Sequence, residues 1–128
     1  MKVSFDFDGT LTRPDVQRYA KRLIENNVEV YIVTARLSNN EAPSKRWNDD
    51  LYQIVDHIGL NRENIKFCGM SDKYHFFKDK DFIFHLDDDS IEVEFINEYT
   101  KTKGIMVFGN EQWESQCEME IAKRNSNI

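Results

Sequence analysis

Five short runs of β-branched and aromatic residues alternate with segments of helical periodicity along this chain of 128 residues. Such runs predict strands, and apolar residues spaced three and four positions apart predict the helices between them. The expected strands cover residues 3–7, 28–33, 65–68, 82–86 and 104–108. Strands that alternate with helices form parallel sheets through right-handed crossovers. The pattern therefore predicts one α/β domain, residues 1–128, with a five-stranded parallel sheet and helices on both of its faces.

Residues with strong capping preferences predict where the helices begin and end. Pro14 opens the first helix, and Ser44 is expected to cap the second, which Gly59 follows. Helical spacing places Trp47 on the core-facing side of that second helix. Ser90 is expected to cap the helix after the fourth strand.

The composition, with 40% hydrophobic and 31% charged residues, is that expected for a soluble globular protein. A formal net charge of −6 argues against broad, non-specific binding of nucleic acid, which needs a basic face. The two cysteines, Cys68 and Cys117, lack metal-ligand spacing and are expected to be reduced thiols. The sequence shows no signal-peptide pattern and no apolar run near the ~20 residues of a membrane span. We therefore expect a cytoplasmic protein without a membrane segment.

Acidic residues collect where two of the predicted strands end. Asp6 and Asp8 follow the first strand, and Asp87 and Asp88 follow the fourth. The carboxyl ends of parallel strands meet at one edge of the sheet, where ligands bind. Converging carboxylates repel each other unless a cation or protons intervene, and all-oxygen ligation suits Mg²⁺. The sequence therefore predicts a magnesium site at this edge, with Gly9 allowing the backbone to turn sharply beside it.

Four motifs in this order resemble those of the haloacid dehalogenase superfamily, and the likeness covers almost the whole chain. They are Asp6-Phe7-Asp8-Gly9-Thr10-Leu11, Thr34 after the strand Tyr31-Ile32-Val33, Lys73, and Asp87-Asp88. The dehalogenases that name the family lack its second aspartate, so the presence of Asp8 matches the phosphotransfer members. The resemblance implies a Rossmann-like three-layer fold with strand order 3-2-1-4-5, and a Mg²⁺-dependent phosphatase.

The resemblance also implies roles for the two N-terminal aspartates and a set of metal ligands. Asp6 would attack phosphorus and form an aspartyl-phosphate. Asp8 would protonate the leaving oxygen and later take a proton from the hydrolytic water. The carboxylates of Asp6 and Asp88 and the backbone carbonyl of Asp8 would hold Mg²⁺. Asp87 would contact the direct ligands rather than the metal, or it would bind the metal through water.

The remaining motif residues are expected to bind the phosphorylated substrate. The Thr34 hydroxyl and the Ala35 N–H would hold phosphate oxygens, and Lys73 would offset the charge of phosphate and Asp6. Gly9 and Arg36 complete the expected substrate-binding set. Arg36 could bind a second phosphate or the substrate body, or it could form a surface ion pair.

Several of these assignments have alternatives in the sequence. Lys78 and Lys80 compete with Lys73 for the role of the phosphate lysine. The metal pair could be Asp88-Asp89 rather than Asp87-Asp88, although Asp89 is also well placed to start a helix. His85 lies within an apolar strand and is expected to be a packed core histidine rather than a base.

The short gaps between motifs leave no room for a folded cap domain, which needs roughly 40 residues. The resemblance then implies an open site that takes large substrates or is completed by a homo-oligomer. Two stretches, Val33-Thr34-Ala35-Arg36 and residues 86–93, resemble the 3′-phosphatase domain of polynucleotide kinases. In the first stretch, Ala35 replaces the glycine that usually follows the threonine in this family. The expected substrate is therefore a nucleotide or a nucleic-acid 3′-phosphate, with a sugar phosphate as the alternative.

A rival interpretation is a non-enzymatic receiver-like domain that accepts a phosphoryl group. Receivers also combine aspartate, threonine, lysine and Mg²⁺ on an α/β sheet, but they carry the phosphorylated aspartate on the third strand. The third strand here ends in Cys68-Gly69-Met70, without an aspartate. This absence disfavours the receiver-like interpretation.

Overall fold

The strands form one parallel sheet. In the computed structural model, which describes residues 1–126, they pair in the order β3-β2-β1-β4-β5. The bounds are β1 Lys2–Phe5, β2 Glu29–Thr34, β3 Ile65–Phe67, β4 Phe84–Asp87 and β5 Lys103–Met106. The predicted fold class and strand order are confirmed, and residues 1–126 contain no separate cap domain.

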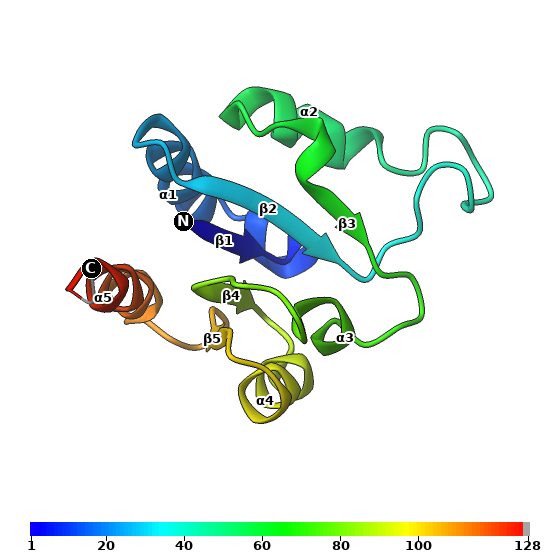
Figure 1. Ribbon diagram of the computed structural model, residues 1–128. Helices are drawn as coiled ribbons and strands as arrows, with labels where there is room; N and C mark the ends of the chain where they lie inside the picture. The colour runs from blue at the N-terminus through cyan, green and yellow to red at the C-terminus, as the bar shows by residue number, and fades with distance from the viewer. Residues whose placement is uncertain (127–128) are drawn as a thin grey trace.

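Helices cover both faces of the sheet (Figure 1). Their bounds are α1 Pro14–Glu25, α2 Asp49–Ile58, α3 Tyr74–Phe77, α4 Ser90–Tyr99 and α5 Trp113–Ser126, with short helical turns at Phe7–Leu11 and Arg62–Asn64. One core cluster joins the sheet to α1, α2 and α5, and a second joins it to α3 and α4. The molecule therefore has three layers. Among the described helices, none has both the length and the apolar character needed to cross a membrane.

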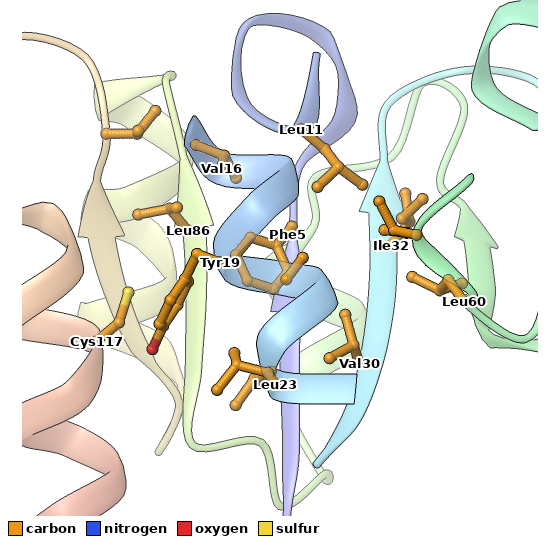
Figure 2. Close-up of a cluster of buried hydrophobic side chains, with 14 of the residues drawn as sticks. Phe5, Leu11, Val16, Tyr19, Leu23, Val30, Ile32, Leu60, Leu86 and Cys117 are labelled. Carbon is orange, nitrogen blue, oxygen red and sulfur yellow. The ribbon is translucent and has the colours of Figure 1, made fainter. Parts of the chain in front are cut away.

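Alternation along β1 sends apolar and polar residues to different faces. Phe5 packs edge-to-face on Tyr19 of α1 with ring centroids 6.2 Å apart, and Tyr19 packs in the same way on Trp113 of α5 at 5.5 Å. Figure 2 shows Phe5 and Tyr19 at the centre of this core. Ser4, the preceding residue, points to the other face because successive side chains of a strand alternate. That second face carries both the smaller core and the polar residues of the site described below.

The second helix begins later than the sequence predicts. It starts at Asp49, not at Ser44. The Ser44 hydroxyl instead accepts a hydrogen bond from the backbone N–H of Arg46 within an exposed turn, at 3.1 Å. Asn48, which is fully buried, donates to the carbonyl of Leu37 at 2.9 Å and ties the two ends of the loop together. This long-range contact decides where the loop ends.

Two further local predictions are wrong. Trp47 lies in the loop before α2 rather than on the helix, and it is 47% exposed instead of packing in the core. Asp89, not Ser90, caps α4. The Asp89 carboxylate accepts from the backbone N–H groups of Ile91 and Glu92 at 2.9 and 3.3 Å. An aspartate at this position also interacts favourably with the helix dipole, which an uncharged serine does not do to the same extent.

Candidate active site

Three carboxylates from distant parts of the sequence lie together at the carboxyl edge of the sheet. Asp6 directly follows β1, Asp87 ends β4, and Asp88 comes next in the chain. One oxygen from each lies within 4.8 Å of the others. The paired strands β1 and β4 are neighbours at the centre of the sheet, so their ends meet. The cluster borders a cavity of about 420 Å³ that Asp8, Ala35 and Lys73 also line.

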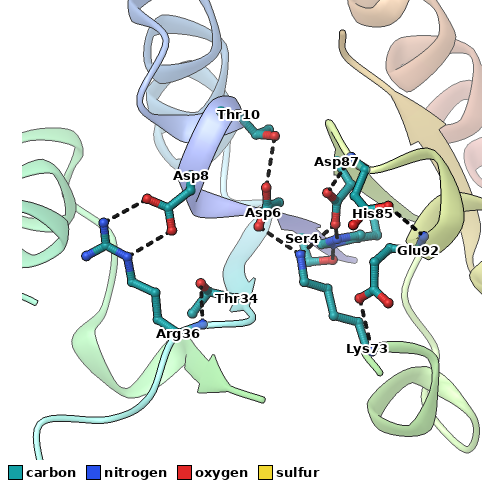
Figure 3. A network of polar contacts seen from close by, with 12 residues as sticks. Ser4, Asp6, Asp8, Thr10, Thr34, Arg36, Lys73, His85, Asp87 and Glu92 are labelled. Atoms are coloured by element: carbon teal, nitrogen blue, oxygen red, sulfur yellow. Dashed lines mark hydrogen bonds and ion pairs between the residues drawn. The ribbon is translucent and has the colours of Figure 1, made fainter. Parts of the chain in front are cut away.

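Lys73 is the lysine that reaches this cluster. Its Nζ donates to Asp6 Oδ1 at 2.7 Å and to Asp87 Oδ2 at 2.6 Å, and the residue is only 2% exposed (Figure 3). The competing Lys78 and Lys80 are exposed. The backbone N–H of Lys73 donates to the Glu92 carboxylate of α4 at 3.1 Å, which fixes the start of α3. The lysine therefore lies between two buried carboxylates and is held from both its side chain and its backbone.

A buried chain of polar contacts continues behind Asp87. His85 Nε2 lies 2.7 Å from Asp87 Oδ2, and His85 Nδ1 lies 2.8 Å from the Ser4 hydroxyl. An ionised carboxylate only accepts, so Nε2 carries the proton, and in the neutral imidazole Nδ1 then accepts from the Ser4 hydroxyl. The backbone N–H of Asp89 donates to the other Asp87 oxygen at 3.0 Å. Asp87 is thus fixed by three neighbours, and His85 is both the expected core histidine and part of the site.

The surroundings set the protonation of these groups. Burial, followed by the charge of Asp87, raises the pKa of Asp6 to about 8 despite the opposing effect of Lys73. Burial also acts to raise the pKa of Asp87, but His85 and Lys73 outweigh it and hold that pKa below its ordinary value. Burial lowers the pKa of His85, which keeps the imidazole neutral. The site therefore holds one firmly ionised carboxylate beside a second whose ionisation an added cation would favour.

The Asp88 side chain packs directly against the backbone of Gly9. A Cβ at Gly9 would collide with Asp88 Oδ2, and Gly9 has a φ of +76°, in the left-handed region. Glycine is therefore required twice, for its backbone conformation and for the space that the carboxylate occupies. Asp89 turns its carboxylate to the α4 backbone, so the carboxylates that gather with Asp6 come from Asp87 and Asp88.

Asp8 points away from the three clustered carboxylates. Its two oxygens accept from Arg36 at 2.8 and 2.9 Å, as Figure 3 shows. The same guanidinium binds both oxygens of Asp50 at 2.7 and 2.9 Å and lies over the Phe7 ring. Arg36 therefore forms ion pairs, which was one of the two roles expected for it. These ion pairs fix the direction of the Asp8 side chain. The Asp8 side chain remains 61% exposed.

Thr34 is the last residue of β2, and Ala35, which follows it, lines the same cavity. Thr34 is 1% exposed, and its hydroxyl oxygen accepts from the backbone N–H of Arg36 at 3.1 Å. That contact leaves the hydroxyl proton available for another acceptor. Ala35 lines the cavity together with Asp6 and Asp8. All of the motif residues predicted from the sequence thus lie at one edge of the sheet.

The sequence did not predict three of the contacts in this site. Ser4 and Glu92 were not expected to belong to it, and His85 was expected only in the core, not as a partner of Asp87. Ser4 and His85 occupy positions two residues before Asp6 and Asp87 on adjacent strands, and they pair directly in the sheet register. Because side chains two apart share a face, this spacing was the signal that could have found them. No comparable signal marks Glu92, whose contact depends on how α3 and α4 pack.

The donor set fits a hard divalent cation. Carboxylate oxygens are the ligands that Mg²⁺ and Ca²⁺ prefer, and two of the three acids are buried, where unpaired negative charge is costly. One lysine lies between Asp6 and Asp87, so the three carboxylates still exceed the local positive charge. Asp87 accepts three hydrogen bonds, two of them on Oδ2, whereas Asp6 accepts only one on each oxygen, from Lys73 and from Thr10. Asp6 and Asp88 are therefore the better direct ligands.

No protein-family model matches this chain, and a search of curated proteins finds no match. Its function must therefore be inferred from the geometry of the site and from the resemblance of its motifs.

Proposed function

We propose that this protein is a Mg²⁺-dependent phosphomonoester hydrolase that works through an aspartyl-phosphate on Asp6, as members of the haloacid dehalogenase superfamily do. One observation carries the proposal. Asp6, at the end of the central strand, shares a cavity with two further carboxylates and with the buried ammonium of Lys73. A nucleophilic carboxylate, a cation site and a fixed positive charge are the parts that phosphoryl transfer needs.

The metal would be held by the carboxylates of Asp6 and Asp88 and by the backbone carbonyl of Asp8. Asp87 would orient the site through its bonds to Lys73 and His85. When bound, Mg²⁺ supplies Lewis-acid stabilisation of charge on a phosphate oxygen. The Asp6 carboxylate, whose pKa burial raises, would then be ionised and nucleophilic at neutral pH.

The reaction divides between Asp6 and Asp8. An Asp6 oxygen attacks phosphorus, the bond to the leaving oxygen breaks, and Asp8 gives that oxygen a proton. Water then loses a proton to the Asp8 carboxylate and attacks phosphorus, which breaks the bond to Asp6 and releases phosphate. Asp8 faces Arg36 in the structure, so its carboxylate must turn toward the cavity that it also lines.

Thr34, Ala35 and Lys73 bind the group in transfer. The Thr34 hydroxyl and the Ala35 N–H donate to the non-bridging oxygens, and Lys73 balances their charge together with that of Asp6. The substrate is a nucleotide, a nucleic-acid 3′-end or, as the second candidate, a sugar phosphate. A homo-oligomer that completes the open site belongs to this second candidate.

The proposal is tested by hydrolysis of p-nitrophenyl phosphate with and without Mg²⁺. We expect Asp6→Asn to lower kcat by at least about 1,000-fold, since it removes the nucleophile. Asp8→Asn should lower kcat by about 10²- to 10⁴-fold, the usual contribution of a general acid and base. Asp56→Asn is the matched control, because Asp56 pairs with Arg62 on the exposed side of α2. Activity retained in Asp6→Asn, or one phosphoryl group kept per chain without turnover, would contradict the proposal.

A further inference from the structure

A second cavity adjoins the one that holds the acidic cluster. It has a volume of about 670 Å³, and Asp8 and Ala35 line both cavities. The rest of its wall comes from the loop between β2 and α2 and from the first turn of α2, including Arg36, Leu37 and Trp47. A phosphate in the first cavity would therefore lie next to this second space, within reach of the remainder of its ester.

The loop presents Trp47 in a fixed position. The indole is 47% exposed, while the next residue, Asn48, is fully buried. Asn48 donates to the carbonyl of Leu37 and to the side chain of Asn39, both at 2.9 Å, and its own oxygen lies 3.4 Å from Arg36. A buried side chain with three partners holds the backbone beside it, so Trp47 forms a defined wall of the cavity.

Each of the two arginines that line the second cavity contacts at least one aspartate. Arg36 binds Asp8 and Asp50 through both of its edges, and Arg46 donates to Asp49 at 3.0 Å. Three carboxylates and only two guanidinium groups line the cavity, and Arg36 stays bound to Asp50 when Asp8 turns to the phosphate, so the cavity is poorly suited to a second phosphate. The unused surface is the face of Trp47. A neutral, planar ring is the group that such a face binds best.

We propose that this cavity binds the nucleoside part of the substrate, with its base stacked on Trp47 and its phosphate directed at Asp6. The inference rests on the proposed phosphatase function and specifies its substrate class. A free nucleotide and the 3′-end of a nucleic acid present the same base and phosphate, and the cavity is open to both.

The kinetic test compares a nucleoside 3′-phosphate with glycerol phosphate, which has no ring. Trp47→Ala should lower the ratio of kcat/KM for the nucleotide to kcat/KM for glycerol phosphate by about 5- to 150-fold, the contribution of one stacked base. Trp47→Phe keeps an aromatic face and should retain most of the ratio. Met119→Ala is the control, since this side chain of α5 is exposed but lines a different cavity. An unchanged ratio in Trp47→Ala overturns the inference.

Two substrate arms distinguish the sources of the base. A 3′-phosphorylated oligonucleotide with a higher kcat/KM than the mononucleotide identifies a strand end, and the reverse order identifies a free nucleotide. Both results support a stacked base provided that the Trp47→Ala effect accompanies them. If Trp47→Ala leaves kcat/KM unchanged for both the oligonucleotide and the mononucleotide, the inference of a stacked base is overturned.

Fluorescence provides a readout that does not depend on turnover. The chain has two tryptophans, and Trp113 is only 5% exposed, so a ligand in the cavity acts on Trp47. In the Asp6→Asn variant, adenosine 3′-phosphate and adenosine should quench the emission, glycerol phosphate should not, and Trp47→Phe should abolish the response. If the nucleosides quench the emission but the wild-type protein hydrolyses no phosphate ester, the phosphatase proposal is rejected and the nucleoside site is kept. Hydrolysis without quenching, and without any Trp47→Ala effect, would do the opposite.

Discussion

Lys73 is the residue on which the stability of the acidic cluster depends. Its ammonium is shared by Asp6 and Asp87, and all three side chains are at most 8% exposed. Burial acts to lower the pKa of Lys73, but the two carboxylates outweigh it and hold the pKa above its ordinary value. The lysine is therefore charged at neutral pH, and it compensates negative charge that the interior would otherwise leave unpaired.

We predict that Lys73→Met lowers the free energy of unfolding at neutral pH by about 3 kcal/mol, because it leaves buried carboxylates without their cation. Methionine keeps most of the length and apolar volume of the lysine, so the change isolates the charge. Urea denaturation followed by circular dichroism measures the difference. Lys78→Met, at the exposed position directly after α3, is the control and should stay close to wild type. Equal midpoints for the two variants would contradict this role.

The residues of the candidate site divide into those that sequence could predict and those that it could not. Asp6, Lys73 and Asp87 are marked by their types and their order, and the structure brings them together. Ser4 and His85 are marked only by their spacing, two residues before Asp6 and Asp87, and their residue types alone fit an ordinary core. Their contact depends on the register between β1 and β4, which a single sequence does not specify.

At the scale of elements, the centres of the strands and helices follow from local composition, whereas their ends depend on contacts from elsewhere. The β-branched run in β2 is sufficient to predict a strand. The start of α2 is different, because the side chain of Asn48 binds Leu37, eleven residues earlier, and so extends the loop. Helical periodicity alone placed Trp47 on the helix, and this tertiary contact overrides it.

The cap of α4 provides a direct test at this scale. We predict that Asp89→Ala lowers the free energy of unfolding by about 1 kcal/mol, because two backbone N–H groups lose their acceptor. Ser90→Ala should change it by less than about 0.5 kcal/mol, since Ser90 is exposed and already inside the helix. Thermal or urea denaturation of the pair decides between them. The opposite order would restore Ser90 as the cap, as the sequence alone suggested.

At the scale of the whole molecule, the parallel topology assembles the site. The carboxyl ends of β1, β2 and β4 meet at one edge, so residues near positions 6, 34 and 87 become neighbours although long segments separate them in sequence. The strand order could be expected from the resemblance of the motifs. The link from Asp8 across to Arg36 and Asp50 could not, because it requires the first turn of α2 to lie beside the turn after β1.

Binding of Mg²⁺ should stabilise the whole fold, because the ion would bind the native arrangement of carboxylates and not the unfolded chain. At a Mg²⁺ concentration ten times its Kd, we expect Tm to rise by about 5 °C for a chain of this size. Asp88→Asn should abolish the rise, because it removes a direct ligand with little effect on the core. Asp56→Asn changes the formal charge equally at a distant surface pair and should keep the full response. Sodium chloride at matched ionic strength accounts for general screening of the net charge of −6. The same rise in both variants would mean that Mg²⁺ acts on the overall charge rather than at the cluster of Asp6, Asp87 and Asp88.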